Sequence, residues 1–355
     1  MKITVLDLFS GIGGFHLGLK GAGFEVESYF SEVDKYAIQV YQNNFKEAKY
    51  VGSVTDVRGT DLPKINAITF GSPCQDFSLA GKRKGMEGNR SSLITHAIRL
   101  IDECRPDFFI WENVKGTFSS NNGEDFWAII QAFTNIGGYR LEWQLLNTKW
   151  FLPQNRERIY LVGYLGNGSG GQVFPIESNY GAFNGATDRA NTCTLTARYT
   201  AIGTGSYINE LYKVPSATKR GYEEARSGDS INLSVPTSKT RRGRVGKGVA
   251  QTLDTHCNQA VVGDFRNDEG YRPRYDGNTP CLTTRCGDVT AQGVIVNKIR
   301  RLTPIECERL QGFPDNWTKF GTQGEISDSQ RYKMCGNAVT VNVVKAVAEQ
   351  IKKVL

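Results

Sequence analysis

One cysteine of the chain stands where its thiol could act as a nucleophile. The stretch GSPCQDFS (71–78) places Cys74 directly after a proline, in a turn that follows the apolar run INAITF. A thiol becomes a strong nucleophile when positive neighbours favour its thiolate form. The stretch QNRERIY (154–160) offers such neighbours, because Arg156 and Arg158 are two residues apart and project to the same side of an extended segment.

A carboxylate follows another apolar segment in the same way. Glu112 lies in WENV, at the end of the predicted strand PDFFIWEN (106–113). The carboxyl ends of parallel strands meet at one edge of a sheet, so we expect the Cys74 thiol, this carboxylate and the two guanidiniums at one site. A turn cysteine is by itself more often inert than catalytic, and the assignment therefore depends on the whole combination.

A glycine-rich turn indicates where a nucleoside cofactor would bind. In DLFSGIGGF (7–15) a predicted strand ends, glycines allow a tight turn, and a helix follows. The glycine order is G-x-G-G and differs from the G-x-G-x-x-G of dinucleotide-binding folds. Glu32, in SEVDKYA (31–37), follows the second predicted strand, where an acid is expected to accept hydrogen bonds from ribose hydroxyls.

The elements that position these residues alternate between strand and helix up to residue 164. This alternation predicts an α/β domain with a parallel sheet covered by helices on both faces. The predicted strands are 3–9, 24–30, 65–70, 106–113 and 158–164.

The pattern changes near residue 165. From there to about 295 the helical periodicity disappears, and short β-like pieces rich in Gly, Thr, Asn and Arg predict a smaller, mostly β and irregular domain. Helical pattern returns in TPIECERLQGF and in VNVVKAVAEQIKKVL, and the latter is amphipathic enough to pack on the sheet. We expect a discontinuous first domain, residues 1–180 plus 325–355, and a second domain with a hinge, residues 181–324.

The charge of the chain is positive and local. The net charge is +7 and the isoelectric point about 8.9. Residues 213–247 hold nine Lys/Arg and three Asp/Glu, so their excess of 9 − 3 = +6 accounts for most of it. A polyanionic partner explains this run, and a solvated loop explains it equally well.

Other classes of protein are disfavoured by the sequence. There is no signal peptide and no apolar stretch of transmembrane length, which indicates a cytoplasmic protein without membrane contact. The eight cysteines show no CxxC and only three histidines occur, so we predict no metal site and reduced thiols.

Taken together, six stretches resemble the motifs of the DNA (cytosine-5)-methyltransferases, in that family's order. The matches lie in residues 3–164 and 298–355, GKRKGMEGNRSSL (81–93) resembles the family's mobile loop, and 165–297 resembles its variable target-recognition region. The resemblance implies a Rossmann-like S-adenosylmethionine-dependent methyltransferase domain with a smaller, mostly β target-recognition domain. The six stretches are DLFSGIGGF, GSPCQDFS, ENV, QNRERIY, RLTPIECERLQGFP and GNAVT.

The resemblance implies a role for each catalytic candidate. Cys74 would attack C6 of a cytosine that has been flipped out of duplex DNA, and C5 would then accept the methyl group. Glu112 would hold the base at N3 and at its exocyclic amine, and Arg158 would bind O2. Arg156 would steady the site through a phosphate or thiolate contact.

The resemblance also implies S-adenosylmethionine as methyl donor, S-adenosylhomocysteine as product, and no metal. Phe9 would stack near the adenine, Gly11 and Gly13 would let the methionine part approach, and Glu32 would bind the ribose. The remaining implied cofactor residues are Ser53, Val54, Leu93 and Asn337.

Two positions depart from the family pattern. Ser53 stands where members commonly carry an acid that reads the adenine amine, and Asp56 lies three residues further on. Val33 stands where an aromatic residue often follows the ribose acid. Both departures predict weaker cofactor binding with an unchanged methyl-transfer step.

Double-stranded DNA is the partner that the resemblance implies. Arg90, Arg241, Arg242 and Arg244 are the candidates for DNA contact, through guanine edges or equally through phosphates alone. We expect a monomer of prokaryotic or phage origin that acts in restriction–modification or in protection of phage or host DNA. A cognate restriction endonuclease would be a functional partner without needing to bind.

Three alternatives remain open at this point. A tRNA cytosine-5 methyltransferase of the same fold would keep the chemistry, although the long Arg- and Thr-rich insert favours duplex DNA. A catalytically silent DNA-binding protein is disfavoured by the intact Cys74, Glu112, Arg156 and Arg158. A nicotinamide-dependent oxidoreductase is disfavoured by the glycine order in GIGGF.

Overall fold

The computed structural model describes most of the chain, in nine stretches, and forms two compact units. The first unit comprises Met1–Leu152, Arg156–Ala182 and Pro304–Leu355, and the second comprises Pro153–Asn155 and Phe183–Thr303. Cys74 and Arg90 lie outside the described residues. The described stretches are 1–72, 93–165, 171–178, 212–226, 228–234, 240–255, 259–266, 270–272 and 298–355.

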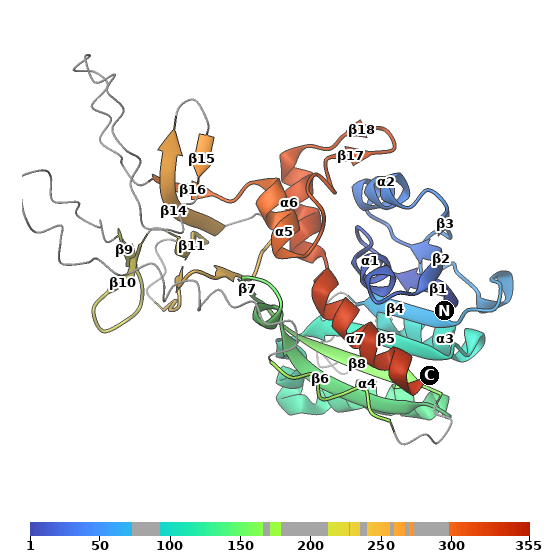
Figure 1. Ribbon diagram of the computed structural model, residues 1–355. Helices are drawn as coiled ribbons and strands as arrows, with labels where there is room; N and C mark the ends of the chain where they lie inside the picture. Colours follow the sequence, from blue (N-terminus) through green and yellow to red (C-terminus); the bar gives the residue numbers. More distant parts are fainter. Residues whose placement is uncertain are drawn as a thin grey trace, which may run out of the picture. The chain divides into compact units, whose positions relative to one another are not determined.

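A seven-stranded sheet in the order β3-β2-β1-β4-β5-β8-β6 is the centre of the first unit (Figure 1). The strands from β3 to β5 run parallel, as the alternation of strands and helices predicted. The strands are β1 (Lys2–Leu8), β2 (Glu25–Ser31), β3 (Lys49–Tyr50), β4 (Ala67–Gly71), β5 (Phe108–Val114), β6 (Arg140–Asn147) and β8 (Glu157–Tyr164).

The far end of this sheet differs from the prediction of a parallel sheet. Strand β8 runs antiparallel to both β5 and β6, and β6 is a strand that the sequence analysis did not predict. Only a short connection with a 3-10 turn at Thr148–Trp150 separates β6 from β8. A parallel crossover needs a dozen or more residues, so this short connection forces the two strands into an antiparallel pair.

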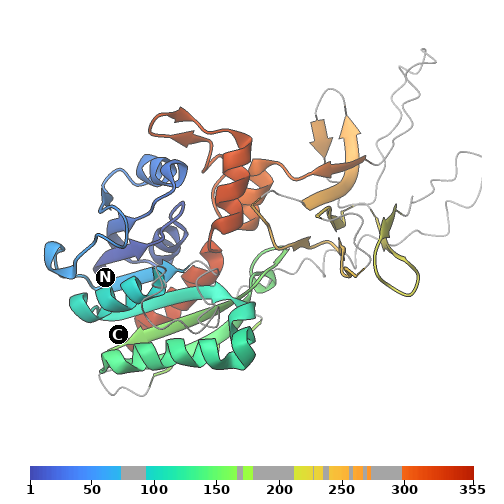
Figure 2. The same ribbon diagram turned by 180° about the vertical axis from the view of Figure 1, so that it is seen from behind.

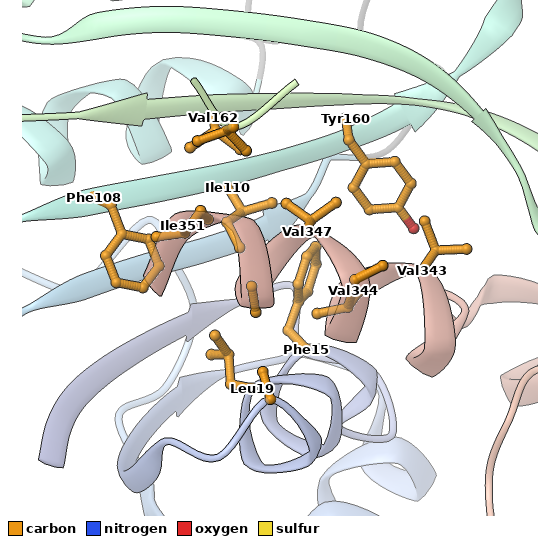
Figure 3. Packing of buried hydrophobic residues seen from close by; sticks show 14 of the residues in the cluster. Phe15, Leu19, Phe108, Ile110, Tyr160, Val162, Val343, Val344, Val347 and Ile351 are labelled. Atoms are coloured by element: carbon orange, nitrogen blue, oxygen red, sulfur yellow. The ribbon is translucent and has the colours of Figure 1, made fainter. Parts of the chain in front are cut away.

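Helices cover both faces of the sheet, as predicted. Helices α7 (Val341–Val354) and α1 (Gly14–Gly21) lie side by side on one face of the sheet, so the last helix of the chain packs beside the first (Figure 1). In Figure 3, Val347 of α7 lies between Ile110 of β5 and Phe15 of α1. The predicted amphipathic C-terminal helix is therefore confirmed, with its apolar stripe buried in the core.

The opposite face carries α3 (Leu93–Cys104) and α4 (Glu124–Ile136), which lie in front of the sheet in Figure 2. Burial on both faces explains why the central strands read as unbroken apolar runs. The side chains of Phe109 and Trp111 on β5 point to this face and are fully buried with Phe133 of α4. Two 3-10 turns, Lys115–Phe118 and Ser120–Gly123, connect β5 to α4.

Helices α2 (Lys35–Asn44), α5 (Pro304–Leu310) and α6 (Asp328–Asn337) gather at the end of the unit that holds the glycine-rich turn. Residues 304–324, which the sequence analysis placed in the second domain, lie in the first unit. The reason is a cluster in which Phe313 and Trp317 pack with Ile12 of the glycine-rich turn. A short hairpin, β17 (Phe320–Gly321) with β18 (Gly324–Glu325), leads from this cluster to α6.

The second unit is built from short strands. Its described residues contain no helix, in line with the predicted mostly β character. The longest strand, β14 (Gln259–Arg266), pairs antiparallel with β11, β15 and β16. The others are β7 (Gln154–Asn155), β9 (Tyr212–Pro215), β10 (Tyr222–Ala225), β11 (Ser230–Asn232), β12 (Val245–Gly246), β13 (Ala250–Gln251), β15 (Gly270–Arg272) and β16 (Lys298–Arg301). Across the described residues, no helix is long and apolar enough to span a bilayer.

Candidate active site

The glycine-rich turn between β1 and α1 has the unusual backbone that its sequence predicted. Phe9, Gly11 and Gly13 all have positive φ values, of 50°, 54° and 87°. A Cβ at Gly13 would lie 2.3 Å from the ring of Phe45, whereas a Cβ at Gly11 would meet nothing within 4 Å. Next to Gly11, the Ser10 hydroxyl is buried and has no hydrogen-bond partner in the described part of the chain. The turn thus offers a ligand open space at Gly11 and, in the Ser10 hydroxyl, a hydrogen-bonding group that no described residue uses.

Glu32 is fixed beside this turn. Its Oε2 accepts a hydrogen bond from the Gly11 N–H at 2.8 Å, and its Oε1 accepts from the N–H groups of Val33 and Asp34 at 2.7 and 2.9 Å. The Tyr50 hydroxyl donates to the Glu32 carbonyl at 3.0 Å. A carboxylate offers about four acceptor positions, so these three bonds orient Glu32 and leave it able to accept from a hydroxyl.

Apolar residues from three segments belong to the cluster that includes Phe9 of this turn. Phe9, Val54 and Leu93 belong to one hydrophobic cluster on the α3 face of the sheet. Arg99 of α3 holds the segment of Val54 in place by donating to the carbonyls of Val54 and Val57, at 3.4 and 2.8 Å. Three of the residues predicted to bind the cofactor thus belong to one hydrophobic cluster.

The departure at Ser53 has a structural context that the sequence did not reveal. The Ser53 and Thr55 hydroxyl oxygens are 2.9 Å apart, and the Thr55 hydroxyl donates to the Asp56 carboxylate at 3.0 Å. Thr55 and Asp56 are both exposed. Thr55 thus links Ser53 to the nearest acid on this segment, and the charge of Asp56 lies within two hydrogen bonds of Ser53.

Glu112 and Arg158 form an ion pair near the ends of β5 and β8. Glu112 lies opposite Gly71 of β4 and Tyr160 of β8, and Arg158 lies opposite Val114. The Arg158 Nε is 3.1 Å from the Glu112 Oε1, and their side chains are only 16% and 10% exposed. This contact is not aligned as a hydrogen bond, so Glu112 Oε1 keeps its hydrogen-bonding capacity. A buried acceptor of this kind favours a ligand with matching donors.

The residue that precedes Pro73 and Cys74 is anchored from β5. The Asn113 side-chain amide donates to both the carbonyl and the hydroxyl of Ser72, each at 3.1 Å. The Trp111 indole N–H donates to the same hydroxyl at 3.0 Å. These bonds fix the chain two residues before the candidate nucleophile, whose own position lies outside the described residues.

Arg156 is buried and holds a distant turn of the chain. Its guanidinium donates to the carbonyls of Gly336 and Ala338, at 3.3 and 2.9 Å. The Thr340 hydroxyl, at the end of the same turn, donates to the Gln311 side chain at 2.8 Å. Asn337, another predicted site residue, lies between the two residues whose carbonyls accept from Arg156. Arg156 therefore holds the backbone on both sides of Asn337, which is exposed.

Val339 connects the two halves of the candidate site. A Cβ on Gly14 would lie 2.6 Å from the Val339 Cγ2, and a Cβ on Gly71 would lie 3.8 Å from its Cγ1. The same Cβ on Gly71 would lie 3.1 Å from the Glu112 Oε2. The Val339 side chain therefore lies near both Gly14, after the glycine-rich turn, and Gly71, which is next to the Glu112 carboxylate.

A buried polar network beneath the glycine-rich turn was missed by the sequence analysis. Asp7 accepts from the Thr69 hydroxyl at 2.8 Å and from the Tyr41 hydroxyl at 3.2 Å. Burial raises the pKa of Asp7 to about 8, and the nearby Glu32 raises it further, against the effect of the two hydroxyls. His16 Nδ1 is 3.1 Å from the Tyr41 hydroxyl, and burial lowers the pKa of His16 to about 3. No sequence pattern distinguished Asp7 from the strand around it.

The three described arginine candidates of the second unit differ in exposure. Arg244 is 2% exposed and donates to the carbonyls of Pro215 and Asn232, at 3.1 and 2.9 Å from its Nη atoms. Arg241 is half-buried and donates to Ser234. Arg242 is exposed and donates through its Nε to the Ala217 carbonyl at 2.9 Å.

Comparison with known proteins gives a single family. The family model described as C-5 cytosine-specific DNA methylase matches residues 3–353. The chain is 30% identical to the orphan methyltransferase M.SPRI of Bacillus phage SPR, over 99% of this chain and 97% of that protein. It is 31% identical to the type II methyltransferase M1.ScrFI of Lactococcus lactis subsp. cremoris, over 100% of this chain and 79% of that protein.

Solved structures agree on the fold. The Entamoeba histolytica methyltransferase EhMeth superposes with a TM-score of 0.60 at 18% sequence identity, over 99% of this chain and 98% of that one. A likeness at this level of identity shows the fold.

Proposed function

This chain belongs to the C-5 cytosine-specific DNA methylase family, and we propose that it methylates C5 of a cytosine flipped out of duplex DNA at a defined sequence. The observation that carries the proposal is the buried Glu112–Arg158 pair next to the anchored Ser72. In this pair the Glu112 carboxylate can accept hydrogen bonds and the Arg158 guanidinium can donate them. A planar base that carries both donors and acceptors could bind to both groups.

The residues around the glycine-rich turn fit S-adenosylmethionine as the methyl donor. The open space at Gly11 and the unused Ser10 hydroxyl provide room and a polar partner for its methionine part. Glu32 would accept hydrogen bonds from the ribose, and the cluster of Phe9, Val54 and Leu93 offers an apolar surface for the adenine. When bound, the cofactor supplies an electrophilic methyl group and leaves as S-adenosylhomocysteine.

Ser53, Asp56 and Asn337 complete this assignment. Ser53 and the linked Asp56 would lie toward the adenine amine, and the Thr55 hydroxyl bridges their two side chains. Asn337 would close the site from the end of α6, with its backbone held by Arg156. We assign Gly13 a structural role, because Phe45 occupies the space where a side chain would lie.

Cys74 would carry the covalent step. Its thiolate adds to C6 of the cytosine, and the electron pair of the C5–C6 double bond moves to C5, which becomes nucleophilic enough to accept a methyl group. A base then removes the proton from C5, the double bond forms again, and the Cys74 thiolate leaves. Each bond made to the enzyme is broken at the end of the cycle.

Glu112 and Arg158 would stabilise this adduct. Glu112 would contact N3 and the exocyclic amine of the flipped base, and Arg158 would contact O2. Both groups are already held in a site with little access to water, where electrostatic interactions are strong and need no reorganisation during the reaction. We propose for Arg156 a positioning role through the turn at Gly336–Ala338.

The second unit would recognise DNA. The exposed Arg242 would contact phosphates or bases, the half-buried Arg241 would do so from its place beside Ser234, and the buried Arg244 would hold the strands that present them. Arg90 would reach the DNA from the segment after Cys74. We propose that the protein acts as a monomer in restriction–modification or in protection of phage or host DNA, with a cognate endonuclease as a functional partner.

Mechanism-based trapping tests the proposal. The protein is incubated with S-adenosylmethionine and a mixed-sequence duplex library that contains 5-fluorocytosine, which cannot lose a proton from C5. A covalent complex on a denaturing gel is expected for the wild type and for Cys104→Ser, and none for Cys74→Ser. Cys104 is a suitable control because it is a half-buried thiol of α3 whose pKa is raised by burial to about 11.

The bound DNA is then sequenced to give the target site. The absence of a complex with wild-type protein, or a complex that persists in Cys74→Ser, would contradict the proposal. A complex with fluorinated tRNA in place of DNA would redirect the assignment to RNA while leaving the chemistry in place.

A further inference from the structure

We propose that Lys333 and Asp34 form a clasp that retains the bound cofactor by tying α6 to the acidic turn that carries Glu32. The inference rests on the proposed function, because it concerns how the proposed cofactor site is kept closed. Lys333 belongs to α6, Asp34 directly precedes α2, and the Lys333 Nζ is 2.6 Å from the Asp34 Oδ2. The two residues are 299 positions apart in the chain.

Asp34 has two roles, one on each carboxylate oxygen. Its Oδ1 accepts from the N–H groups of Tyr36 and Ala37, at 2.9 and 3.4 Å, and so caps the first turn of α2. Its Oδ2 accepts from Lys333. The cap already fixes the Asp34 side chain, so the ion pair costs little additional side-chain entropy on the acid's side.

The clasp is connected directly to the cofactor residues. The Asp34 N–H donates to Glu32 Oε1, and Glu32 Oε2 accepts from Gly11. Asn337 ends the helix on which Lys333 lies, one turn further along. A continuous series of contacts thus runs from the glycine-rich turn through Glu32 and Asp34 to Lys333.

Charge around Lys333 supports the same arrangement. The hydrogen bond to Asp34 and its charge raise the pKa of Lys333, and Glu32 contributes in the same direction. The pKa of Asp34 is lowered by Lys333 and by the two backbone donors, against the effect of its burial. The charges of both acids of this turn therefore act on Lys333.

Apolar and neutral contacts from α6 and from the segment before it also hold the glycine-rich turn. Met334 packs with Ile12 and Ala37 in one cluster, and the Trp317 indole N–H donates to the Ile12 carbonyl at 2.9 Å. These contacts are made by other side chains, so they do not depend on Lys333. Loss of the ion pair should therefore loosen the end of α6 without unfolding it.

The clasp should control release of the cofactor more than the methyl-transfer step. Its side chains are 46% and 23% exposed, so the ion pair is weakened by salt. Exposed ion pairs contribute modestly, and we expect product release about threefold to fivefold faster when this one is removed. An ion pair that contributes this much slows the release of S-adenosylhomocysteine, but its loss does not abolish binding.

The test is a double-mutant cycle on release of S-adenosylhomocysteine, measured by stopped-flow displacement at low and high salt. The variants are Lys333→Met, Asp34→Asn and the double variant. Asn is itself a good helix cap, so Asp34→Asn removes the charge and keeps the start of α2. Lys345→Met is the control, because it removes a lysine of similar exposure whose acidic neighbour, Glu349, is 3.8 Å away on α7.

Each single variant is expected to release the ligand faster at low salt, and the double variant no faster than either one. Salt should accelerate release from the wild type and have little effect on the three variants. Single variants with wild-type rates, or single effects that add in the double variant, would overturn the clasp. If the double-mutant cycle supports the clasp but the wild-type protein does not trap 5-fluorocytosine, the proposed cytosine reaction is contradicted and the clasp is not.

Discussion

The guanidinium of Arg156 donates a hydrogen bond to the carbonyl of Ala338, which lies 182 residues later in the chain. This bond joins the segment before β8 to the turn between α6 and α7. Arg156 was predicted to be catalytic. Through this bond it also holds in position the turn that covers the glycine-rich turn.

Replacing Arg156 by lysine should therefore affect both stability and cofactor binding. The lysine ammonium cannot form the pair of bonds to Gly336 and Ala338 with the geometry of a planar guanidinium. We expect a loss of about 1.5–3 kcal/mol in the free energy of unfolding, as for a buried hydrogen bond from a charged donor. Urea unfolding and calorimetric titration with S-adenosylhomocysteine measure the two effects. Arg140→Lys, at an exposed arginine of β6, is the matched control.

Replacing Glu112 by glutamine should slow the reaction without unfolding the protein. The amide keeps the shape of the carboxyl group and removes its charge beside Arg158. Loss of one preorganised electrostatic contact to the reacting base predicts a reduction of kcat by about 100-fold or more. Single-turnover methylation of duplex DNA measures it, with thermal unfolding as the check of the fold. Turnover at the wild-type rate in Glu112→Gln would show that Glu112 does not act in the reaction.

Much of the first unit could be predicted from its sequence because local signals and packing agree there. Unbroken apolar runs identified the central strands, and the positive φ values at Gly11 and Gly13 are those that a glycine-rich turn requires. Glu112 and Arg158 do form an ion pair, but the rule that gathers functional residues at the carboxyl ends of parallel strands does not explain it, because Arg158 lies at the start of β8, which runs antiparallel to β5.

Other features depend on partners far away in the chain and left no local signal. Strand β6 mixes exposed and half-buried residues before two buried ones, so no alternating pattern marked it in the sequence, and its pairing with β8 defines it. Arg244 looked like its neighbour Arg242 in the sequence, yet carbonyls of two other segments bury it. Sequence alone does not show which arginine of such a run finds carbonyls to bind.

The buried Asp7 should make the stability of the protein fall with pH. Its pKa is about 8 in the folded protein and 3.8 when it is freely solvated, so the folded state binds a proton that the unfolded state releases between these values. Stability from this group is therefore lost as the pH rises through that window, by about 1.4 kcal/mol per pH unit. His16 acts at the acidic side, because its lowered pKa costs stability only as the pH falls below 6.5.

Asp7→Asn isolates this effect. The asparagine oxygen can accept from Thr69, and its amide can donate to the Tyr41 oxygen, without a titratable group. Between pH 6.5 and 8, urea unfolding should show a decline in the wild type that is absent in Asp7→Asn and retained in Asp102→Asn, a control at an exposed carboxylate of α3. Equal declines in all three proteins would show that Asp7 is ionised in the folded state throughout this range.

Alanine at Gly13 and at Gly11 should separate stability from cofactor binding. Both glycines have positive φ values, so alanine is strained at either position by about 1 kcal/mol. Only at Gly13 does the added methyl also meet the Phe45 ring, at 2.3 Å, and we expect Gly13→Ala to lose a further 1–3 kcal/mol, roughly the cost of overpacking a core.

At Gly11 the added methyl enters the open space that the cofactor would occupy. Gly11→Ala should therefore lose only the backbone strain of about 1 kcal/mol from its free energy of unfolding, and it should bind S-adenosylhomocysteine at least about tenfold more weakly, which corresponds to about 1.4 kcal/mol. Unfolding curves and calorimetric titrations of both variants measure the contrast. Gly11→Ala with wild-type affinity would place the cofactor away from this turn, because a methyl group in an occupied space cannot leave binding unchanged.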